Sequence, residues 1–266
     1  MATVTERGSA DEPCDGPPVP ADMLCSVERL LWAPGCGTGR GPKRSLTLTQ
    51  IAAATVRIAD AHGLDAVSMQ RVAADLGVTK MALYRYLPGK AELLALAVEE
   101  AVEEPPDLSG IAGGWRPRLE TWARLLRDVW QRHPWLPAAT VGDRSMGPRE
   151  VGWIESATAT LTGTGLPAQE QLDAVLLLCG LLRTTNSAGA AGTQPWTMSA
   201  ATGTTLRTLL AQRAGDFPAL LALLPDGRVR QPVTETPTLQ SSWETGLRLL
   251  LDGLQTAMRR HAPSER

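Results

Sequence analysis

Residues 68–90 read SMQRVAADLGVTKMALYRYLPGK, and this stretch determines the fold that the sequence predicts. Ser68 is a candidate N-cap for a helix whose apolar residues recur at i, i+3, i+4 and i+7. Those apolar positions are Met69, Val72, Ala73 and Leu76. Gly77 can then reverse the chain, because a residue without a Cβ atom adopts positive φ without strain. The spacing predicts a short amphipathic helix followed by a sharp turn.

A second short helix follows the turn. Thr79 can cap a helix over residues 80–87, and the Pro-Gly pair at 88–89 ends it. Leu83 and Leu87 fall on one side of this helix and are expected to point into the bundle. Two short helices joined by a tight turn form a helix-turn-helix, whose second helix fits the major groove of DNA.

Basic side chains are concentrated around the same stretch. The whole chain has a net charge of −2, which by itself says nothing about nucleic acid. Residues 1–39 carry two basic and six acidic side chains, whereas residues 40–90 carry eight basic and three acidic ones. A positive patch on a helix-turn-helix favours attraction to DNA phosphates, and a solvated basic face is the alternative.

The exposed side of the second helix is expected to meet DNA. Lys80 can donate to guanine, while Met81 and Ala82 offer apolar contact to a thymine methyl group. Nearby hydroxyl and ammonium groups suit phosphate oxygens, which fix the register of a protein on the duplex. These candidate phosphate contacts are Ser68, Thr79, Tyr84, Tyr86 and Lys90. The alternative for Tyr84 is a buried ring with its hydroxyl at the surface.

The segment before the helices of this basic region has a different composition. Residues 1–44 are expected to be a mostly disordered extension, because its start is rich in Pro, Gly, Asp and Ser. An apolar piece at 30–32 could dock on the body as one helical turn. Arg40, Lys43 and Arg44 suit phosphate or minor-groove contact, and a polar linker is the alternative.

Two further helices complete this first domain. Thr49 is a candidate N-cap for a helix that runs to about His62. Its inward face is expected to carry Ile51, Thr55, Ile58 and Ala61. Residues 91–103 form a fourth amphipathic helix, and a loop follows it. We therefore expect a DNA-binding domain over residues 45–104 and a regulatory and dimerisation domain over residues 105–266.

The sequence LGVTKMALYRYLPGKAELL, preceded by TQIAAATVRIADAHGLDAVSMQRVA, resembles the N-terminal domain of the tetracycline-repressor (TetR) family of bacterial transcription regulators. The resemblance implies a three-helix DNA-binding domain joined to a larger helical ligand-binding and dimerisation domain. It also implies that Gln70 reads bases, since its amide can bond adenine bidentately. It further implies that the protein is a repressor that binds a near-palindromic DNA operator. A small-molecule effector would release the protein from this operator.

The second half is also predicted to be helical, because Ala, Leu and Arg are abundant and β-branched runs are scarce. An amphipathic helix begins at Trp115 and stops at Pro134. Residues 169–188 are apolar nearly all round, and residues 239–260 carry leucines at helical spacing. We expect these last two helices to pair with their copies in a homodimer, as the family resemblance also implies. Burial within one chain is the alternative.

Tryptophans at 122, 130, 135 and 153 could line a cavity for a flat apolar ligand, or they could be plain core. The predicted lining of this effector cavity is Trp122, Leu126, Trp153, Cys179, Arg183 and Asn186. Arg183 and Asn186 are polar on an otherwise apolar helix, and solvation of the helix end explains them equally well. The regulatory half also resembles the TetR type. Residues 135–150 contain no histidine, so we do not expect magnesium-tetracycline to be the ligand.

Several classes of function are not supported. No Ser/His/Asp set, phosphate loop or pair of metal sites is visible, so neither an enzyme nor a bound cofactor or metal is expected. The four cysteines form no C-x-x-C pair. The absence of an apolar run long enough for a membrane span, and of a secretory signal, predicts a cytoplasmic protein. A helical ligand-binding protein that does not read DNA remains the main alternative.

Overall fold

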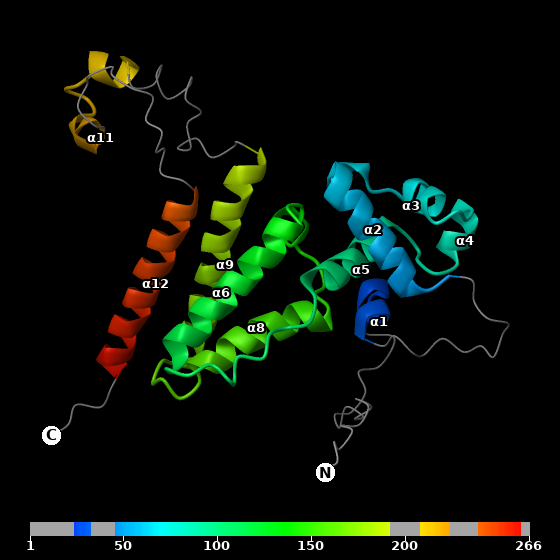
Figure 1. Cartoon of the computed structure of the whole chain (residues 1–266), viewed down its shortest axis with the longest axis horizontal. Helices are drawn as coiled ribbons and strands as arrows, with labels where there is room; N and C mark the ends of the chain where they lie inside the picture. Colours follow the sequence, from blue (N-terminus) through cyan, green and yellow to red (C-terminus); the bar gives the residue numbers. More distant parts are fainter. Residues whose placement is uncertain (1–23, 33–45, 192–207, 224–238, 262–266) are drawn as a thin grey trace, which may run out of the picture.

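The computed structural model describes residues 24–32, 46–191, 208–223 and 239–261, and every regular element in these ranges is a helix (Figure 1). The helices are α1 (Ser26–Trp32), α2 (Leu48–His62), η1 (Leu64–Ala66), α3 (Met69–Asp75), α4 (Lys80–Tyr84), α5 (Lys90–Val102), α6 (Trp115–Arg132), α7 (Leu136–Ala139), α8 (Pro148–Leu161), α9 (Ala168–Ala191), α11 (Pro218–Leu223) and α12 (Leu239–His261). Helices α2 to α5 form one group, called the head below. Helices α6 to α9 and α12 form the body. The all-α prediction is confirmed.

The caps of the helix-turn-helix follow the sequence signals closely. The Ser68 hydroxyl accepts the Arg71 N–H, and the Thr79 hydroxyl accepts the Ala82 N–H. Gly77 has a φ of 66°, in the region that favours glycine. The predicted helix over residues 80–87 is too long, since α4 ends at Tyr84. The chain tightens there into bonds of the 3₁₀ type before the prolyl residue.

The predicted cap of the first head helix is wrong. Thr47, not Thr49, is the N-cap of α2, and its hydroxyl accepts the Gln50 N–H while the Gln50 side chain accepts the Thr47 N–H. This reciprocal capping box satisfies two N–H groups that the helix itself leaves without partners. The predicted inward face is correct at its first three positions, but Ala61 is exposed near the end of the helix.

Helix α5 is the joint between head and body. It packs against α2 on one side and against α6, α7 and α8 on the other. It runs from Lys90 to Val102, one residue earlier at each end than predicted. Because α5 belongs to the cores of both groups, the domain boundary at residues 104 and 105 stays a prediction.

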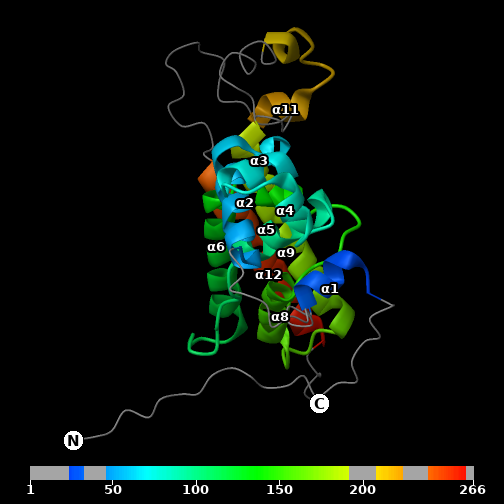
Figure 2. The ribbon, with the colours of Figure 1, turned by 90° about the vertical axis from the view of Figure 1, so that its right-hand side faces the viewer.

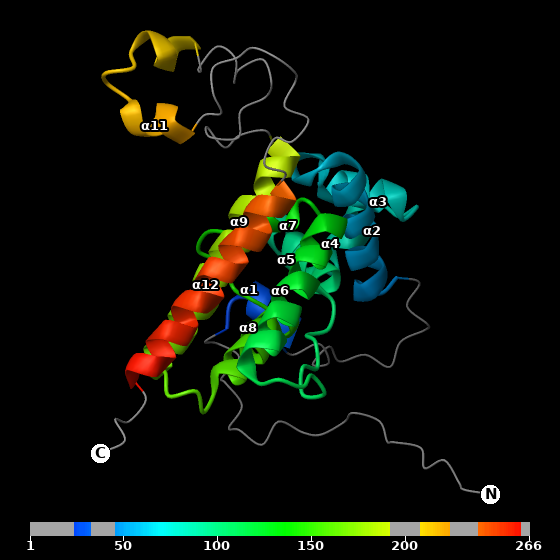
Figure 3. The same cartoon turned by 60° about the vertical axis from the view of Figure 1, so that its left-hand side comes forward.

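The body is a layer of long helices in which α9 and α12 lie side by side and antiparallel (Figures 1 and 3). A Cβ atom on Gly246 of α12 would lie 2.6 Å from Leu181 Cδ1 of α9, so glycine permits this close approach within one chain. Helix α9 extends to Ala191, beyond the predicted end at 188. Figure 2 looks at the molecule from the side of the head, so that α2, α3 and α4 lie in front of α12 of the body.

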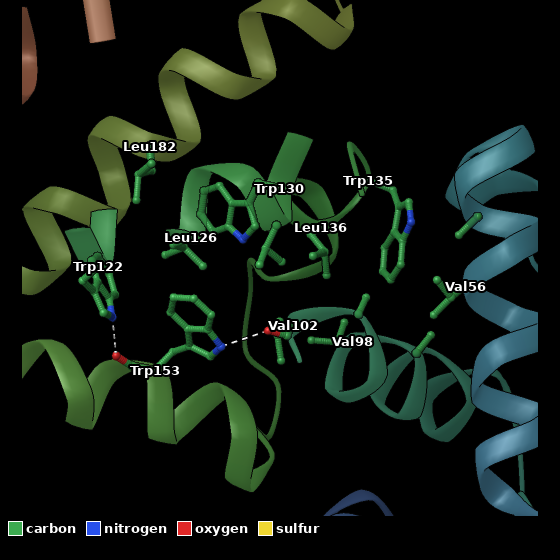
Figure 4. Packing of buried hydrophobic residues seen from close by; sticks show 14 of the residues in the cluster. Val56, Val98, Val102, Trp122, Leu126, Trp130, Trp135, Leu136, Trp153 and Leu182 are labelled. Carbon is green, nitrogen blue, oxygen red and sulfur yellow. Dashed lines mark hydrogen bonds between the residues drawn. The ribbon is translucent and has the colours of Figure 1, made fainter. Parts of the chain in front are cut away.

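One buried cluster runs through both groups of helices (Figure 4). Val56 of α2 and Val98 of α5 belong to it, as do tryptophans 122, 130, 135 and 153, each at most 5% exposed. The core alternative for these tryptophans is therefore correct, and it does not exclude a cavity between them.

Candidate functional site

Helix α4 has one buried and one exposed side. Leu83 and Leu87 are completely buried, as predicted, whereas Met81 is 72% exposed and Lys80 is also exposed. The Lys80 ammonium lies 5.5 Å from the centre of the Tyr84 ring, and Tyr84 is itself exposed. The start of α4 thus presents a cation and an apolar side chain to the surroundings, which is the chemistry that a base edge requires.

The other predicted DNA contacts lie around α4. Gln70, Ser68 and Lys90 are exposed, while Ala82 and Tyr86 are partly buried. The hydroxyls of Ser68 and Thr79 accept N–H groups in their caps, and their own hydrogens stay available to donate to a phosphate. Arg40, Lys43 and Arg44 lie outside the described residues.

A cavity of about 260 Å³ lies in the body, against the end of α5. It is lined by Val102, Trp122, Leu126, Trp130, Thr140, Gly142, Arg144, Met146, Glu150, Trp153, Ile154, Leu176, Cys179 and Arg183. The structure brings five of the six predicted lining residues together here. The sixth, Asn186, is not part of the lining, and its amide donates to Leu182 O of its own helix at 3.0 Å.

Sequence reasoning missed the loop that forms one wall of this cavity. Thr140, Gly142, Arg144 and Met146 come from the segment between α7 and α8. Helical periodicity identifies faces of helices, and this segment has no period. Only the tertiary fold places it beside α9.

Arg183 is the polar group of most interest in the cavity. Its guanidinium lies 5.2 Å from the Trp130 ring and donates to Thr140 Oγ1 at 3.0 Å and to Pro137 O. Among the described residues no carboxylate forms an ion pair with it, and burial lowers its pKa. Arg144, in contrast, pairs with the Glu150 carboxylate through both terminal nitrogens.

Cys179 is the free thiol in the cavity. Burial raises the pKa of Cys179 to about 11, which keeps the group neutral near pH 7. A neutral, partly buried thiol behaves as a small apolar side chain and not as a nucleophile. Cys179 therefore contributes an apolar group to the cavity wall.

Three sets of contacts fix the body to the head. Asp60 of α2 accepts from Trp135 Nε1 at 2.7 Å and lies 2.8 Å from His133 Nδ1. Trp153 Nε1 donates to Val102 O, the last residue of α5, at 2.9 Å (Figure 4). These contacts give His133 a structural role at the junction.

The third set lies at the start of α8. The Glu99 carboxylate of α5 accepts the N–H groups of Arg149 and Glu150 at 3.0 and 3.2 Å. It thereby caps α8 from another helix, at an end that carries partial positive charge. Burial raises the pKa of Glu99, against the effect of these two hydrogen bonds. Glu99 therefore links the start of α8 directly to α5.

The part of the chain that the structure describes contains neither a metal site nor a membrane-spanning helix. There, no group of His, Cys, Asp and Glu side chains is placed to hold a metal ion. None of the described helices is long and apolar enough to cross a lipid bilayer.

The sequence matches known families over both groups of helices. Residues 51–97 match the bacterial regulatory proteins of the tetR family, and residues 109–258 match the tetracyclin repressor-like C-terminal domain. The HTH-type transcriptional repressor DrrR1 of Streptomyces coeruleorubidus is 38% identical over 242 residues, which cover 88% of this chain and 86% of the relative.

Solved structures show the same fold. A possible TetR family transcriptional regulator from Streptomyces coelicolor A3(2) superposes with a TM-score of 0.63 and 27% identity, covering 79% of this chain and 99% of that one. ActR from Streptomyces coelicolor, in its complex with (S)-DNPA, superposes with a TM-score of 0.65 and 24% identity, covering 82% of this chain and 100% of that one. The matches cover the DNA-binding and the regulatory halves together. The chain therefore belongs to the TetR family of bacterial transcriptional regulators.

Proposed function

We propose that this protein is a repressor that binds a near-palindromic DNA operator as a homodimer and releases it when a small molecule fills the cavity of the body. The observation that carries this proposal is the arrangement of α4, which buries its leucines and exposes Lys80 and Met81 at its start. The relative DrrR1 is named as a repressor, and ActR is solved with small molecules bound. Both support the same assignment here.

The two copies pair through α9 and α12. Each helix leaves leucines exposed in the single chain, and solvent contact of such a set is unfavourable. These leucines are Leu172, Leu176, Leu177 and Leu249, with Leu177 at 66% and Leu249 at 64% exposed. A two-fold pairing presents two α4 helices about 34 to 36 Å apart, one turn of DNA.

Removing the Lys80 side chain tests the proposed reading helix. We expect Lys80→Ala to weaken binding by about 1 to 3 kcal/mol, because a lost contact to a base or phosphate is not replaced by alanine. Affinity would be measured by gel shift on the duplex that the native protein enriches from a random pool. Arg124→Ala, in the exposed part of α6, removes the same charge and serves as the control. Equal affinities for the two variants would place the reading surface elsewhere.

The cavity indicates the chemical class of the effector. Trp122, Trp130 and Trp153 line it, which favours a flat aromatic molecule. Arg183 has already lost part of its hydration, and among the described residues the nearby Glu150 carboxylate forms its ion pair with Arg144 and not with Arg183. An acidic oxygen on the effector would offset that loss, because a buried charge is stabilised by a hydrogen-bonded counter-charge. We therefore propose a planar aromatic acid.

A pair of probes separates this class from a neutral aromatic ligand. We expect anthraquinone-2-carboxylate to bind about tenfold or more tightly than its carboxamide, since a hydrogen bond to a charged group contributes about 1.5 to 3 kcal/mol. Binding would be followed by quenching of tryptophan fluorescence. The preference should vanish in Arg183→Gln and persist in the exposed control Arg124→Gln. A carboxamide that binds the native protein as well as the acid does would exclude this role for Arg183.

A further inference from the structure

Helix α1 lies outside both stretches that match the family, which begin at residues 51 and 109. It is nevertheless held firmly by the rest of the chain. It packs against α5 of the head (Figure 1), and its Leu31 is buried. Ser26 Oγ donates to Glu92 Oε1 at 2.5 Å, and Glu92 is a buried carboxylate in the first turn of α5.

The same helix is bonded to the body at both of its ends. Near its start, Glu28 accepts the Ser145 hydroxyl at 2.9 Å, and Cys25 Sγ lies 3.5 Å from Ser145 Oγ. At its last residue, Trp32 Nε1 donates to Met146 O at 2.9 Å. The hydrogen bonds from the Cys25 N–H and the Ser145 hydroxyl lower the pKa of Glu28, so its carboxylate is ionised at neutral pH.

The segment that α1 touches is also a wall of the effector cavity. Gly142, Arg144 and Met146 line the cavity, while Ser145 and the Met146 carbonyl bond α1. Residues that alternate along an extended segment point to opposite sides. A molecule that displaces Arg144 or Met146 must therefore also move the groups that hold α1.

We propose that α1 acts as a latch between the cavity loop, residues 140–147, and the first turn of α5. A change in the conformation of the loop is transmitted through α1 to that turn. This inference rests on the proposed function, and it adds a route from cavity to head beside the contacts of Asp60 and Glu99. With α1 docked, the loop and Glu92 are held in one arrangement. An effector that shifts the loop breaks the hydrogen bonds from Ser145 to Glu28 and from Trp32 to Met146 O. Helix α1 is then less firmly bound, and so the hydrogen bond from Ser26 to Glu92 is weakened.

A reversible crosslink tests the latch without any effector. The short distance between Cys25 Sγ and Ser145 Oγ makes Ser145→Cys a suitable partner for Cys25. Cys14→Ser, Cys36→Ser and Cys179→Ala in the same chain leave Cys25 and the new cysteine as the two thiols. In the full-length protein oxidised with diamide, we expect amide exchange of residues 90–96 to slow at least threefold, and to recover on reduction. Identical exchange in the two redox states would overturn the proposal.

A second variant keeps the test independent of disulfide formation. Ser145→Ala removes the bond to Glu28, and we expect it to speed exchange of residues 90–96 at least twofold. The matched control is Thr158→Ala, whose hydroxyl donates to Ile154 O of its own helix. Equal exchange rates in the two variants would show that α1 merely covers the surface.

The crosslinked protein also separates the latch from the proposed effector class. With anthraquinone-2-carboxylate present, the oxidised form should stay on DNA at probe concentrations that release the reduced form. If the probe does not bind at all, the proposed effector is wrong, and the exchange measurements still decide on the latch. If the probe binds and releases both redox forms equally, the latch is wrong and the effector class stands.

Discussion

Leu177→Arg is expected to convert the dimer into a folded monomer and to weaken operator binding by about 10² to 10⁴-fold. Leu177 is 66% exposed on α9, so arginine there costs little within one chain. In a two-fold interface the same change occurs twice, and each guanidinium would be buried without a partner. The loss of affinity for the operator is large because a monomer binds one half-site and gains nothing from the second.

Light scattering and a DNA titration would check both parts of this expectation. Binding to a duplex with a single half-site should be almost unchanged, since the head is intact. Leu125→Arg, on α6 and 38% exposed, is the control for adding a charge to the body surface. A Leu177→Arg protein that remains dimeric would exclude α9 from the interface.

The helix-turn-helix could be predicted from sequence because its signals are local. Ser68, Gly77 and Thr79 are within a few residues of the groups they bond or the turns they permit. The error at Thr49 has a local explanation as well. Thr47 is followed three residues later by Gln50, which is the capping-box pattern, whereas Thr49 has no such partner.

The cavity was predictable only where helices build it. Trp122, Leu126 and Arg183 lie on helical faces that periodicity reveals, and the structure brings them together. Asn186 lies nearly one turn beyond Arg183 and bonds its own helix instead. The loop with Arg144 lacks any period, and its position depends on contacts between distant parts of the chain.

The junction could not be predicted for the same reason. Asp60 and His133 are separated by 73 positions, and neither residue sits in a pattern that names the other. Glu99 reads as one more charged residue on an exposed helix, yet it is buried and caps α8. The periodicity of the sequence predicts the individual helices. Which helix ends contact each other can be known only from the three-dimensional structure.

The second large effect is expected from Trp122→Ala, which should destabilise the protein by about 3 to 5 kcal/mol, the range for removing a buried aromatic side chain. Trp122 has no exposed surface, and its indole N–H donates to Trp153 O at 2.8 Å. Its ring meets Trp153 edge to face, with centres 6.1 Å apart. Because the site already adjoins a cavity, the surrounding side chains have little means of closing the space.

Urea unfolding at a fixed protein concentration would measure the loss, because the stability of a dimer depends on concentration. Trp122→Phe keeps much of the apolar area and removes the hydrogen bond, so it should cost only about 0.5 to 1.5 kcal/mol, because the Trp153 carbonyl still accepts from the Ser156 hydroxyl. Leu125→Ala, on the exposed side of the same helix, should change stability by only about 0.5 kcal/mol. If alanine at 122 cost no more than phenylalanine, the indole would stabilise the fold only through its hydrogen bond, and the cavity wall would not depend on its volume.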